Sequence, residues 1–309
     1  MQSRTIRATL TLVAVAAASL ATAAGALARG HAAAAKPGAG KPAVTIGDKN
    51  FSEENLLGAL YAQALQAKGF KVKLKDNIGS SEITWKALKA GQIDLYPEYT
   101  GTLLSEIAGK KTNPSSAKAA YADAQAFASK EGFRLLAATP FADSNVLAVK
   151  PAYAKQHGLT TIASLAKLGS DVTLGAPPEF QTRNDGLPGI KKAYGVDPTF
   201  KPVAIGLAYK SLDGGDVDVQ LVFTTDGQLT SGKYVLLKDP KGVFGYQNVA
   251  PVVSKKVLAA EGPEFAKTLN AVSRLLTLKA IQSLNHAITS QKLSPRSVAA
   301  KFLKANHLA

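Results

Sequence analysis

Short apolar runs of strand length alternate with longer stretches of helical periodicity through most of the chain. Val44–Gly47 and Val172–Gly175 are two such runs, and each is followed by a loop and then by a helical stretch. Alternation of short strands with helices of about 10 to 15 residues is typical of α/β folds with mostly parallel sheets. We therefore predict an α/β fold.

The pattern repeats along the chain. Val44–Gly47 matches Val172–Gly175 at an offset of 128 residues. Trp85–Leu95 matches Tyr209–Val219 at an offset of 124, and both read as a helix, a glycine at its end and a buried strand. Either match alone is short enough to arise by chance, but two matches in the same order predict two similar α/β lobes.

Two extended runs, Ser144–Lys150 and Asn248–Ser254, end the two halves and are candidate strands between the lobes. After them Pro263 begins a segment with apolar residues at helical spacing, namely Phe265, Leu269, Val272 and Leu276. If these helices pack on the first lobe, that lobe is discontinuous. We expect lobe I at residues 43–146 and 250–309, lobe II at 147–249, and a ligand cleft that closes about two hinge strands.

The N-terminus predicts export. Arg4 and Arg7 precede 21 uncharged residues that end in Ala26-Leu27-Ala28, the small-x-small pattern that a signal peptidase cuts. We predict a signal peptide at residues 1–28, a flexible leader at 29–42 and a location outside the cytoplasmic membrane. An uncleaved anchor is the alternative, although so much Ala, Thr and Gly makes a weak membrane span.

Composition and charge narrow the function classes. The 309 residues are 46% hydrophobic and contain no cysteine, which excludes disulfides, thiolate metal sites, a cysteine nucleophile and a lipid-modified N-terminal cysteine. The formal charge is +15, of which residues 1–42 hold +5 and residues 255–309 hold +7. Because this excess lies outside the predicted ligand-binding body, it indicates a solvated basic face rather than a nucleic-acid groove.

Ligand contacts in an open α/β sheet come from loops just past the carboxyl ends of strands. The repeat identifies these loops as residues 47–54 and 96–102 in the first lobe and 175–183 and 220–227 in the second. Tyr99 and Phe223 are equivalent positions at the 124-residue offset. We expect these two aromatic side chains to face each other across the cleft.

Four blocks in these loops resemble a known family, the substrate-binding proteins of ABC importers for quaternary ammonium compounds such as glycine betaine and choline. The blocks are Gly-Asp-Lys-Asn-Phe-Ser-Glu-Glu at 47–54, Tyr-Pro-Glu-Tyr-Thr-Gly-Thr at 96–102, Pro-Pro-Glu-Phe-Gln-Thr-Arg at 177–183 with Asp-Gly-Leu-Pro-Gly at 185–189, and Thr-Thr-Asp-Gly at 224–227. Several blocks in the right order are far more specific than a single motif. The resemblance implies the two-lobed periplasmic-binding-protein fold, type II, with the ligand between the lobes.

The resemblance also implies roles for individual residues. Tyr99 and Phe223 match positions of an aromatic cage, which suits a trimethylammonium group because this cation has no N–H to donate and is attracted to ring faces. Lys49, Thr102 and Arg183 match positions that hold the ligand's carboxylate. A core role is the alternative for the two aromatic side chains, and a solvated role is the alternative for Lys49.

Other positions leave the ligand open. Asn50 is a ligand candidate, but Asn50 and Ser52 also fit helix caps. Where relatives often carry tyrosine this chain has Asn145 and Gln247, with Tyr246 as a possible replacement wall. Two amides suit a ligand with polar edges, so a larger betaine such as ergothioneine is the alternative to glycine betaine, proline betaine, choline or carnitine. Glu98 and Asp226 are expected to accept hydrogen bonds from loop N–H groups.

No catalytic or metal-binding cluster is visible, because the four histidines are scattered and no pairing of nucleophile and base stands out. We therefore expect no enzyme activity, no metal and no cofactor. The expected protein is a monomeric receptor with an ABC permease and ATPase as partners, no nucleic acid, no lipid anchor, and membrane contact only through the permease. A ligand sensor or an enzyme on the same fold is the alternative.

Overall fold

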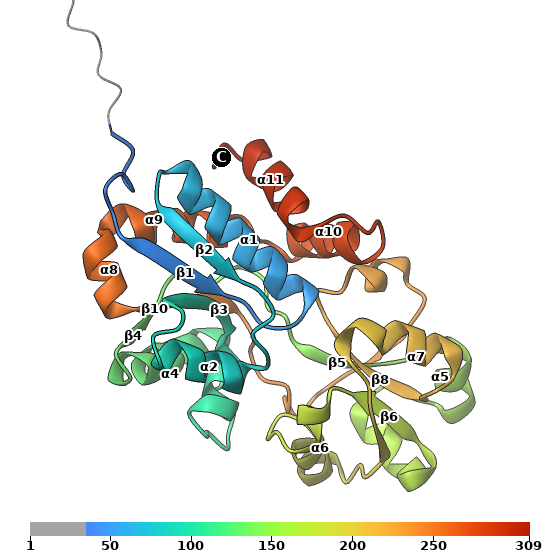
Figure 1. Ribbon diagram of the computed structural model, residues 1–309. Helices are drawn as coiled ribbons and strands as arrows, with labels where there is room; N and C mark the ends of the chain where they lie inside the picture. The colour runs from blue at the N-terminus through green and yellow to red at the C-terminus, as the bar shows by residue number, and fades with distance from the viewer. Residues whose placement is uncertain (1–34) are drawn as a thin grey trace, which may run out of the picture. The chain divides into compact units, whose positions relative to one another are not determined.

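The computed structural model describes residues 35–309, which contain two five-stranded sheets covered by helices (Figure 1). The first sheet has the order β2-β1-β3-β10-β4, and the second has the order β7-β6-β8-β5-β9. The strands of the first sheet are β1 (Ala43–Gly47), β2 (Lys71–Lys75), β3 (Leu95–Tyr99), β4 (Phe133–Leu135) and β10 (Val249–Ser254). Those of the second are β5 (Asn145–Val149), β6 (Thr173–Ala176), β7 (Thr199–Pro202), β8 (Val219–Phe223) and β9 (Val235–Leu237).

The two sheets have the same topology, which confirms the internal repeat. In the first, β1 pairs in parallel with β2 and β3, and β10 is antiparallel to β3 and β4. In the second, β6 pairs in parallel with β7 and β8, and β5 is antiparallel to β8 and β9. Each antiparallel strand belongs to the sheet of the other half of the chain: β5 follows the first half but lies in the second sheet, and β10 follows the second half but lies in the first sheet. The chain therefore crosses between the sheets twice.

The two crossing segments lie side by side. Ala142 and Asn248, which precede β5 and β10, form an isolated antiparallel bridge. Thr224, just after β8, binds the first of them: its N–H donates to the Ser144 carbonyl oxygen at 3.0 Å, and its hydroxyl donates to the Ala142 carbonyl oxygen at 3.1 Å. Two adjacent connections of this kind are the usual construction of a hinge.

The first lobe has a hydrophobic core on each face of its sheet. On one face, α1 packs against α9, α10 and α11. On the other, Trp85 lies against Phe127 and Phe133 in a core formed with α2 and α4. The helices of this lobe are α1 (Ser52–Ala67), α2 (Ser81–Lys89), α3 (Thr100–Thr102) with the π-helical turn η1 (Leu103–Ile107), α4 (Ala117–Lys130), α8 (Lys255–Glu261), α9 (Pro263–Leu275), α10 (Leu278–Thr289) and α11 (Pro295–Ala305).

The second lobe has shorter helices and more 3₁₀ turns. Its larger core contains Leu147, Leu174 and Val219 from the sheet, and its smaller core lies beneath α7. The helices are α5 (Pro151–His157), α6 (Leu187–Tyr194) and α7 (Ala208–Gly214), and the 3₁₀ turns are η2 (Ile162–Asp171), η3 (Pro178–Gln181), η4 (Ile205–Leu207) and η5 (Gly227–Ser231).

Local sequence accounts for where the C-terminal helices begin. Pro263 is the first residue of α9, where its missing N–H leaves no intrahelical bond unmade. Thr277 and Ser294 cap α10 and α11, since their side-chain oxygens accept from the N–H groups of Ala280 and Ser297. The predicted apolar face of α9 is fully buried against α1. The C-terminal helices thus complete the first lobe, as expected.

The predicted signal peptide, residues 1–28, and residues 29–34 of the predicted leader lie outside the described residues. Residues 35–42 include a turn that lies against the segment after α1, where the Gly38 N–H donates to the Lys68 carbonyl oxygen at 3.0 Å. The Lys41 Nζ donates to the Ala260 carbonyl oxygen of α8 at 2.8 Å. Within residues 35–309 there is no helix with the length and apolar character needed to cross a bilayer.

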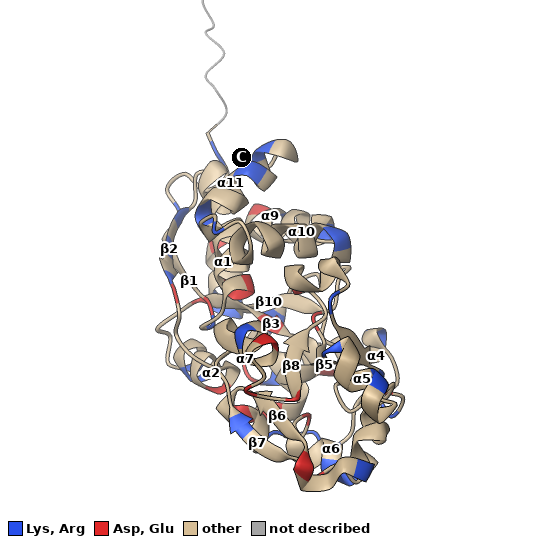
Figure 2. Cartoon of the chain, turned by 90° about the vertical axis from the view of Figure 1, so that its right-hand side faces the viewer, with Lys and Arg blue, Asp and Glu red and all other residues tan. Residues whose placement is uncertain are grey.

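Positive charge gathers on the periphery of the first lobe. Figure 2 shows Lys and Arg on β2 and on α11. The lysines of β2, at positions 71, 73 and 75, are exposed, and so are all nine Lys and Arg residues after Ser254. The basic excess of residues 255–309 is therefore a solvated face.

Candidate functional site

A pocket of about 650 Å³, which includes its open mouth, lies where the carboxyl ends of β1, β3, β6 and β8 meet. The first lobe contributes Lys49 to Phe51 and Tyr99, and the second contributes Pro177, Glu179, Phe180 and Phe223. These are the strand-end loops that the repeat identified. Such loops are the usual ligand-binding position of an open α/β sheet.

Eight of the nine expected site residues line this pocket, and they come from both lobes and the crossover. They are Lys49, Asn50, Tyr99, Thr102, Asn145, Arg183, Phe223 and Gln247. The ninth, Tyr246, does not line it: its side chain is 39% exposed, and its hydroxyl donates to the Ser115 carbonyl oxygen at 3.2 Å. Gln247 points inward instead, so the adjacent Tyr246 side chain points out.

Three aromatic rings form one wall. Phe51 lies between Tyr99 and Phe223, with ring centroids 6.2 Å away on each side and interplanar angles of 25° and 12°. Tyr99 and Phe223 are the last residues of β3 and β8, as the repeat predicted. The sequence reasoning missed Phe51, although it lies in the quoted 47–54 block. It occupies the N-cap position of α1 without a side-chain cap bond, so Asn50 and Ser52 do not cap this helix.

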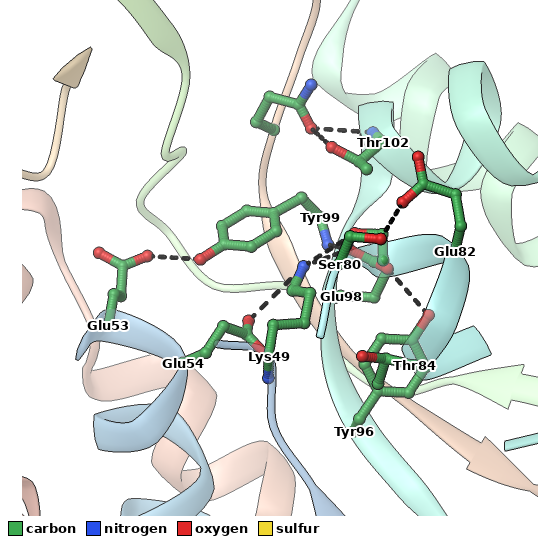
Figure 3. Close-up of polar contacts among 12 residues, drawn as sticks. Lys49, Glu53, Glu54, Ser80, Glu82, Thr84, Tyr96, Glu98, Tyr99 and Thr102 are labelled. Atoms are coloured by element: carbon green, nitrogen blue, oxygen red, sulfur yellow. Dashed lines mark hydrogen bonds and ion pairs between the residues drawn. The ribbon is translucent and has the colours of Figure 1, made fainter. Parts of the chain in front are cut away.

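Lys49 is buried and paired with carboxylates (Figure 3). Its Nζ donates to Glu98 Oε1 at 2.7 Å and to Ser81 Oγ at 3.3 Å, and it lies 3.8 Å from Glu54 Oε1. The same ammonium group is 4.1 Å from the centroid of the Tyr99 ring. Lys49 therefore contacts the aromatic wall through Tyr99, and the neighbouring carboxylates balance its charge.

Arg183 forms a two-point ion pair with Glu82 on α2, which belongs to the other lobe. Arg183 Nε lies 3.2 Å from Glu82 Oε1, and Nη2 lies 3.1 Å from Oε2. Burial by itself raises the pKa of the Glu82 carboxyl, but hydrogen bonds from Arg183 and Ser80 outweigh it and lower the pKa to about 2. The pair leaves the Nη1 group of Arg183 available to a ligand.

Gln247 and Asn145, the two amides at positions where relatives often carry tyrosine, differ in their hydrogen bonding. Gln247 is buried and engaged: its Oε1 accepts from the Thr102 N–H at 3.0 Å and the Thr102 hydroxyl at 3.3 Å, and its Nε2 donates to the Phe244 carbonyl oxygen at 3.2 Å. Asn145 pairs with Phe223 across β5 and β8, and its amide has no hydrogen-bond partner among the described residues. Asn145 is thus the amide that remains free for a ligand.

Two buried carboxyl groups lie at the hinge side of the pocket, and the sequence reasoning did not single them out. The Tyr99 hydroxyl donates to Glu53 Oε1 at 2.8 Å, and Asn285 Nδ2 donates to Glu53 Oε2 at 2.7 Å. The Thr225 hydroxyl donates to Asp143 Oδ1 at 2.6 Å, and Asp143 lines the pocket. Burial raises the pKa of both carboxyl groups.

Glu98 and Asp226 accept backbone hydrogen bonds, as expected. Glu98 Oε1 accepts from the Tyr99 N–H at 2.7 Å, and Asp226 Oδ2 accepts from the Phe223 N–H at 3.0 Å. These bonds fix the strand ends that present the two rings. Among residues 35–309, no cluster of three or more His, Asp or Glu side chains is arranged to hold a metal ion.

Comparisons with known proteins agree with this geometry. Residues 42–305 match the family model described as the substrate binding domain of ABC-type glycine betaine transport systems. A glycine-betaine-binding protein of Pseudomonas aeruginosa is 32% identical over 85% of this chain and 88% of its own length. A solved structure titled as a glycine betaine/carnitine/choline ABC transporter is 29% identical, covers 86% of this chain and 99% of its own, and gives a TM-score of 0.69.

A third relative is the ergothioneine transport permease/ergothioneine binding protein of Helicobacter pylori. It is 31% identical over 85% of this chain, and the match covers 47% of its own length. The lactococcal OpuAC in its closed, glycine betaine-bound form is 18% identical with a TM-score of 0.62 and shows the same fold. The expectation of the type II two-lobed periplasmic-binding-protein fold is confirmed.

Proposed function

This chain belongs to the family of substrate-binding domains of ABC-type glycine betaine transport systems, and on this premise we propose that its pocket binds a quaternary-ammonium zwitterion. The protein is the substrate-binding component of a betaine- or carnitine-type ABC importer and not an enzyme. The observation that supports this ligand is the wall of three rings, Phe51, Tyr99 and Phe223, at the junction of the two lobes.

The cationic end of the ligand is assigned to this wall. A trimethylammonium group has a polarised methyl surface and no donor, so it gains most from ring faces and apolar contact. Each ring is worth roughly 0.5 to 2 kcal/mol, so three rings supply at most about 6 of the roughly 8 kcal/mol that micromolar affinity requires, and the carboxylate end supplies the rest.

The carboxylate end is assigned to Arg183, with Thr102 and Lys49 in support. Arg183 is the main donor because Glu82 fixes its orientation while Nη1 stays unused. Lys49 and the Thr102 hydroxyl already have protein partners, so each contributes mainly by holding the pocket wall.

A larger betaine with a polar ring, such as ergothioneine, is the second candidate. The observation that favours it is the free amide of Asn145 beside Phe223, which offers a donor and an acceptor at a position where an aromatic ring was expected. The similarity to the Helicobacter pylori ergothioneine-binding protein is consistent with this candidate.

We further propose that the protein acts as an extracytoplasmic monomer without a lipid anchor and delivers its ligand to an ABC permease and ATPase. The lobes are assigned to residues 43–146 with 250–309 and to residues 147–249. The two sheets support this division, with β5 already part of the second sheet from Asn145 onward. Closure follows because the ligand touches both lobes at once.

A thermal-shift panel tests the ligand class. The purified protein is heated with glycine betaine, proline betaine, choline, carnitine, ergothioneine and plain amino acids. Stabilisation by one or more methylated ammonium compounds is expected. Stabilisation by the amino acids alone would exclude a quaternary-ammonium site, and the comparison of ergothioneine with glycine betaine separates the two candidates.

A further inference from the structure

Four carboxyl groups are buried around the aromatic wall together with a single cation. Glu53, Glu54, Glu98 and Asp143 are each at most 6% exposed, and Lys49 is the only buried Lys or Arg side chain within residues 35–309. Lys49 lies 2.7 Å from Glu98 and 3.8 Å from Glu54. Glu53 and Asp143 have no ion pair in the described part of the chain. Four buried negative charges against one positive charge are too costly to keep, so some of these groups carry protons.

Asp143 is the member of this set that faces the ligand space. It lines the pocket, whereas Glu53 lies behind the Tyr99 hydroxyl that donates to it. Thr225 holds Asp143 Oδ1 at 2.6 Å, and the second oxygen, Oδ2, has no hydrogen-bond partner among the described residues. The Asp143 N–H donates to the Gln247 carbonyl oxygen at 3.0 Å, so both crossing segments fix the position of this residue.

From the aromatic wall, the free oxygen and the charge imbalance, we propose that Asp143 is the counter-charge for the ligand's ammonium group and that ligand binding releases its proton. In the ligand-free protein the carboxyl group is neutral. When a permanently charged quaternary ammonium enters, the carboxyl O–H bond breaks, the proton leaves to solvent buffer, and the carboxylate remains opposite the cation. The negative charge that Asp143 gains then offsets the positive charge of the ammonium group opposite it. This inference rests on the proposed function, because it requires a cationic ligand.

The groups packed around Asp143 support this assignment. Burial and the charge of Glu53 on α1 raise the pKa of Asp143, and Asp226 beyond β8 raises it further, while the Thr225 bonds lower it. Tyr99 on β3 and Tyr209 on α7 face the same region, and burial raises their pKa values, so both are neutral. Of the cations that line the pocket, Lys49 is paired with Glu98 and Arg183 with Glu82. No ion pair joins Asp143 to a Lys or Arg side chain of residues 35–309.

Calorimetry in two buffers measures the proton directly. Glycine betaine and choline are titrated at one pH near neutrality in phosphate and in Tris, whose heats of ionisation differ, and the difference in binding heat gives the number of protons released. Wild type is expected to release up to about one proton. Asp143→Asn keeps the oxygen that accepts from Thr225, and it is expected to bind more weakly and to release none. Glu53→Gln is the matched variant and is expected to retain release.

Each outcome decides between the two proposals. Binding with heats that do not depend on the buffer would overturn the proton-release inference and leave the proposed function intact. Release that persists in Asp143→Asn, or that disappears only in Glu53→Gln, would also overturn the assignment to Asp143. Failure of wild type to bind any quaternary ammonium compound would overturn the proposed function and this inference together.

Discussion

Arg183 and Glu82 join the two lobes through a fork-shaped ion pair, with Nε to Oε1 at 3.2 Å and Nη2 to Oε2 at 3.1 Å. Arg183 follows η3 of the second lobe, and Glu82 lies in the first turn of α2 in the first lobe. The same guanidinium therefore holds the lobes together and presents its remaining donors to the pocket. Binding of the ligand's carboxylate by Arg183, as we propose, would couple recognition to closure in one side chain.

Replacement of Arg183 is expected to weaken binding strongly. Arg183→Ala removes both the interlobe pair and the donor to the ligand, and affinity should fall more than tenfold, which is about 1.4 kcal/mol. Arg183→Lys keeps the charge but not the fork-shaped group, and its affinity for the ligand should fall almost as far. Glu82→Gln leaves the guanidinium in place and should reduce the affinity less than either Arg183 variant does. Calorimetric titration measures the ligand affinity of all three variants. An unchanged affinity of Arg183→Ala would show that Arg183 does not bind the ligand.

The same ion pair predicts a loss of stability in acid. The folded pKa of Glu82 is about 2, below the ordinary value near 4.5. The stabilisation it provides is therefore present above the unfolded pKa and is lost as the pH falls from about 4.5 towards 2. The melting temperature of wild type should exceed that of Glu82→Gln near pH 7, and the difference should shrink by about pH 3. A difference that stays constant over this range would contradict the assignment.

The aromatic wall is expected to recognise charge as well as apolar surface. Phe223→Ala should weaken binding more than tenfold, and Phe51→Ala should have a comparable effect because its ring lies between the other two. Phe223→Leu keeps the apolar contact and removes the ring face. This substitution should weaken the binding of choline more than the binding of 3,3-dimethylbutanol, the uncharged carbon analogue of choline. Equal losses for the two ligands, measured by competition, would assign Phe223 to apolar packing alone.

Much of the fold and part of the site followed from sequence patterns because local and repeated features determine them. The match of Trp85–Leu95 with Tyr209–Val219 depends on a helix, its glycine and the next strand, and these form in the same way in both lobes. Tyr99 and Phe223 were found because the repeat places them at equivalent strand ends. No side-chain contact had to be known in advance.

The contacts between distant segments were not predictable in this way. Glu82 reaches Arg183 across 101 positions, and Asn285 reaches Glu53 across 232, so neither pairing leaves a trace in local periodicity. Asp143 lies in an Ala-Asp-Ser-Asn run that resembles an ordinary loop. The outward direction of Tyr246 was not predictable, because it follows from the inward direction of Gln247, which depends on bonds to Thr102 that only the folded chain provides.

Gly227 is expected to tolerate no side chain. It begins η5 of the second lobe, and a Cβ there would lie 2.5 Å from the backbone of His286 in α10. Gly227→Ala must therefore push α10 and η5 apart near the crossover, and the free energy of unfolding should fall by about 1 to 3 kcal/mol. Gly206→Ala is the control, since a Cβ at that position meets nothing within 4 Å. Urea titration compares the two, and equal stabilities would refute this close approach.

Asp48 is expected to make stability fall as the pH rises. Its side chain is fully buried in the loop after β1, and burial raises its pKa to about 7, although the N–H of Asn77 and the amide of Asn55 donate to Oδ1. Because the folded pKa lies above the unfolded value near 3.9, the folded state binds the extra proton. The stabilisation is complete below about pH 4 and is lost as the pH rises through about 7.

Asp48→Asn cannot ionise, so it should gain stability relative to wild type as the pH rises from about 5 to about 8. Its amide oxygen can still accept the two bonds that Oδ1 accepts. Asp197→Asn is the control, because Asp197 is exposed and pairs with Lys191 at the surface, and a pH-dependent gain like that of Asp48→Asn is not expected there. Urea unfolding at several pH values measures both differences. If the Asp48→Asn difference does not vary with pH, Asp48 is ionised in the folded protein throughout this range.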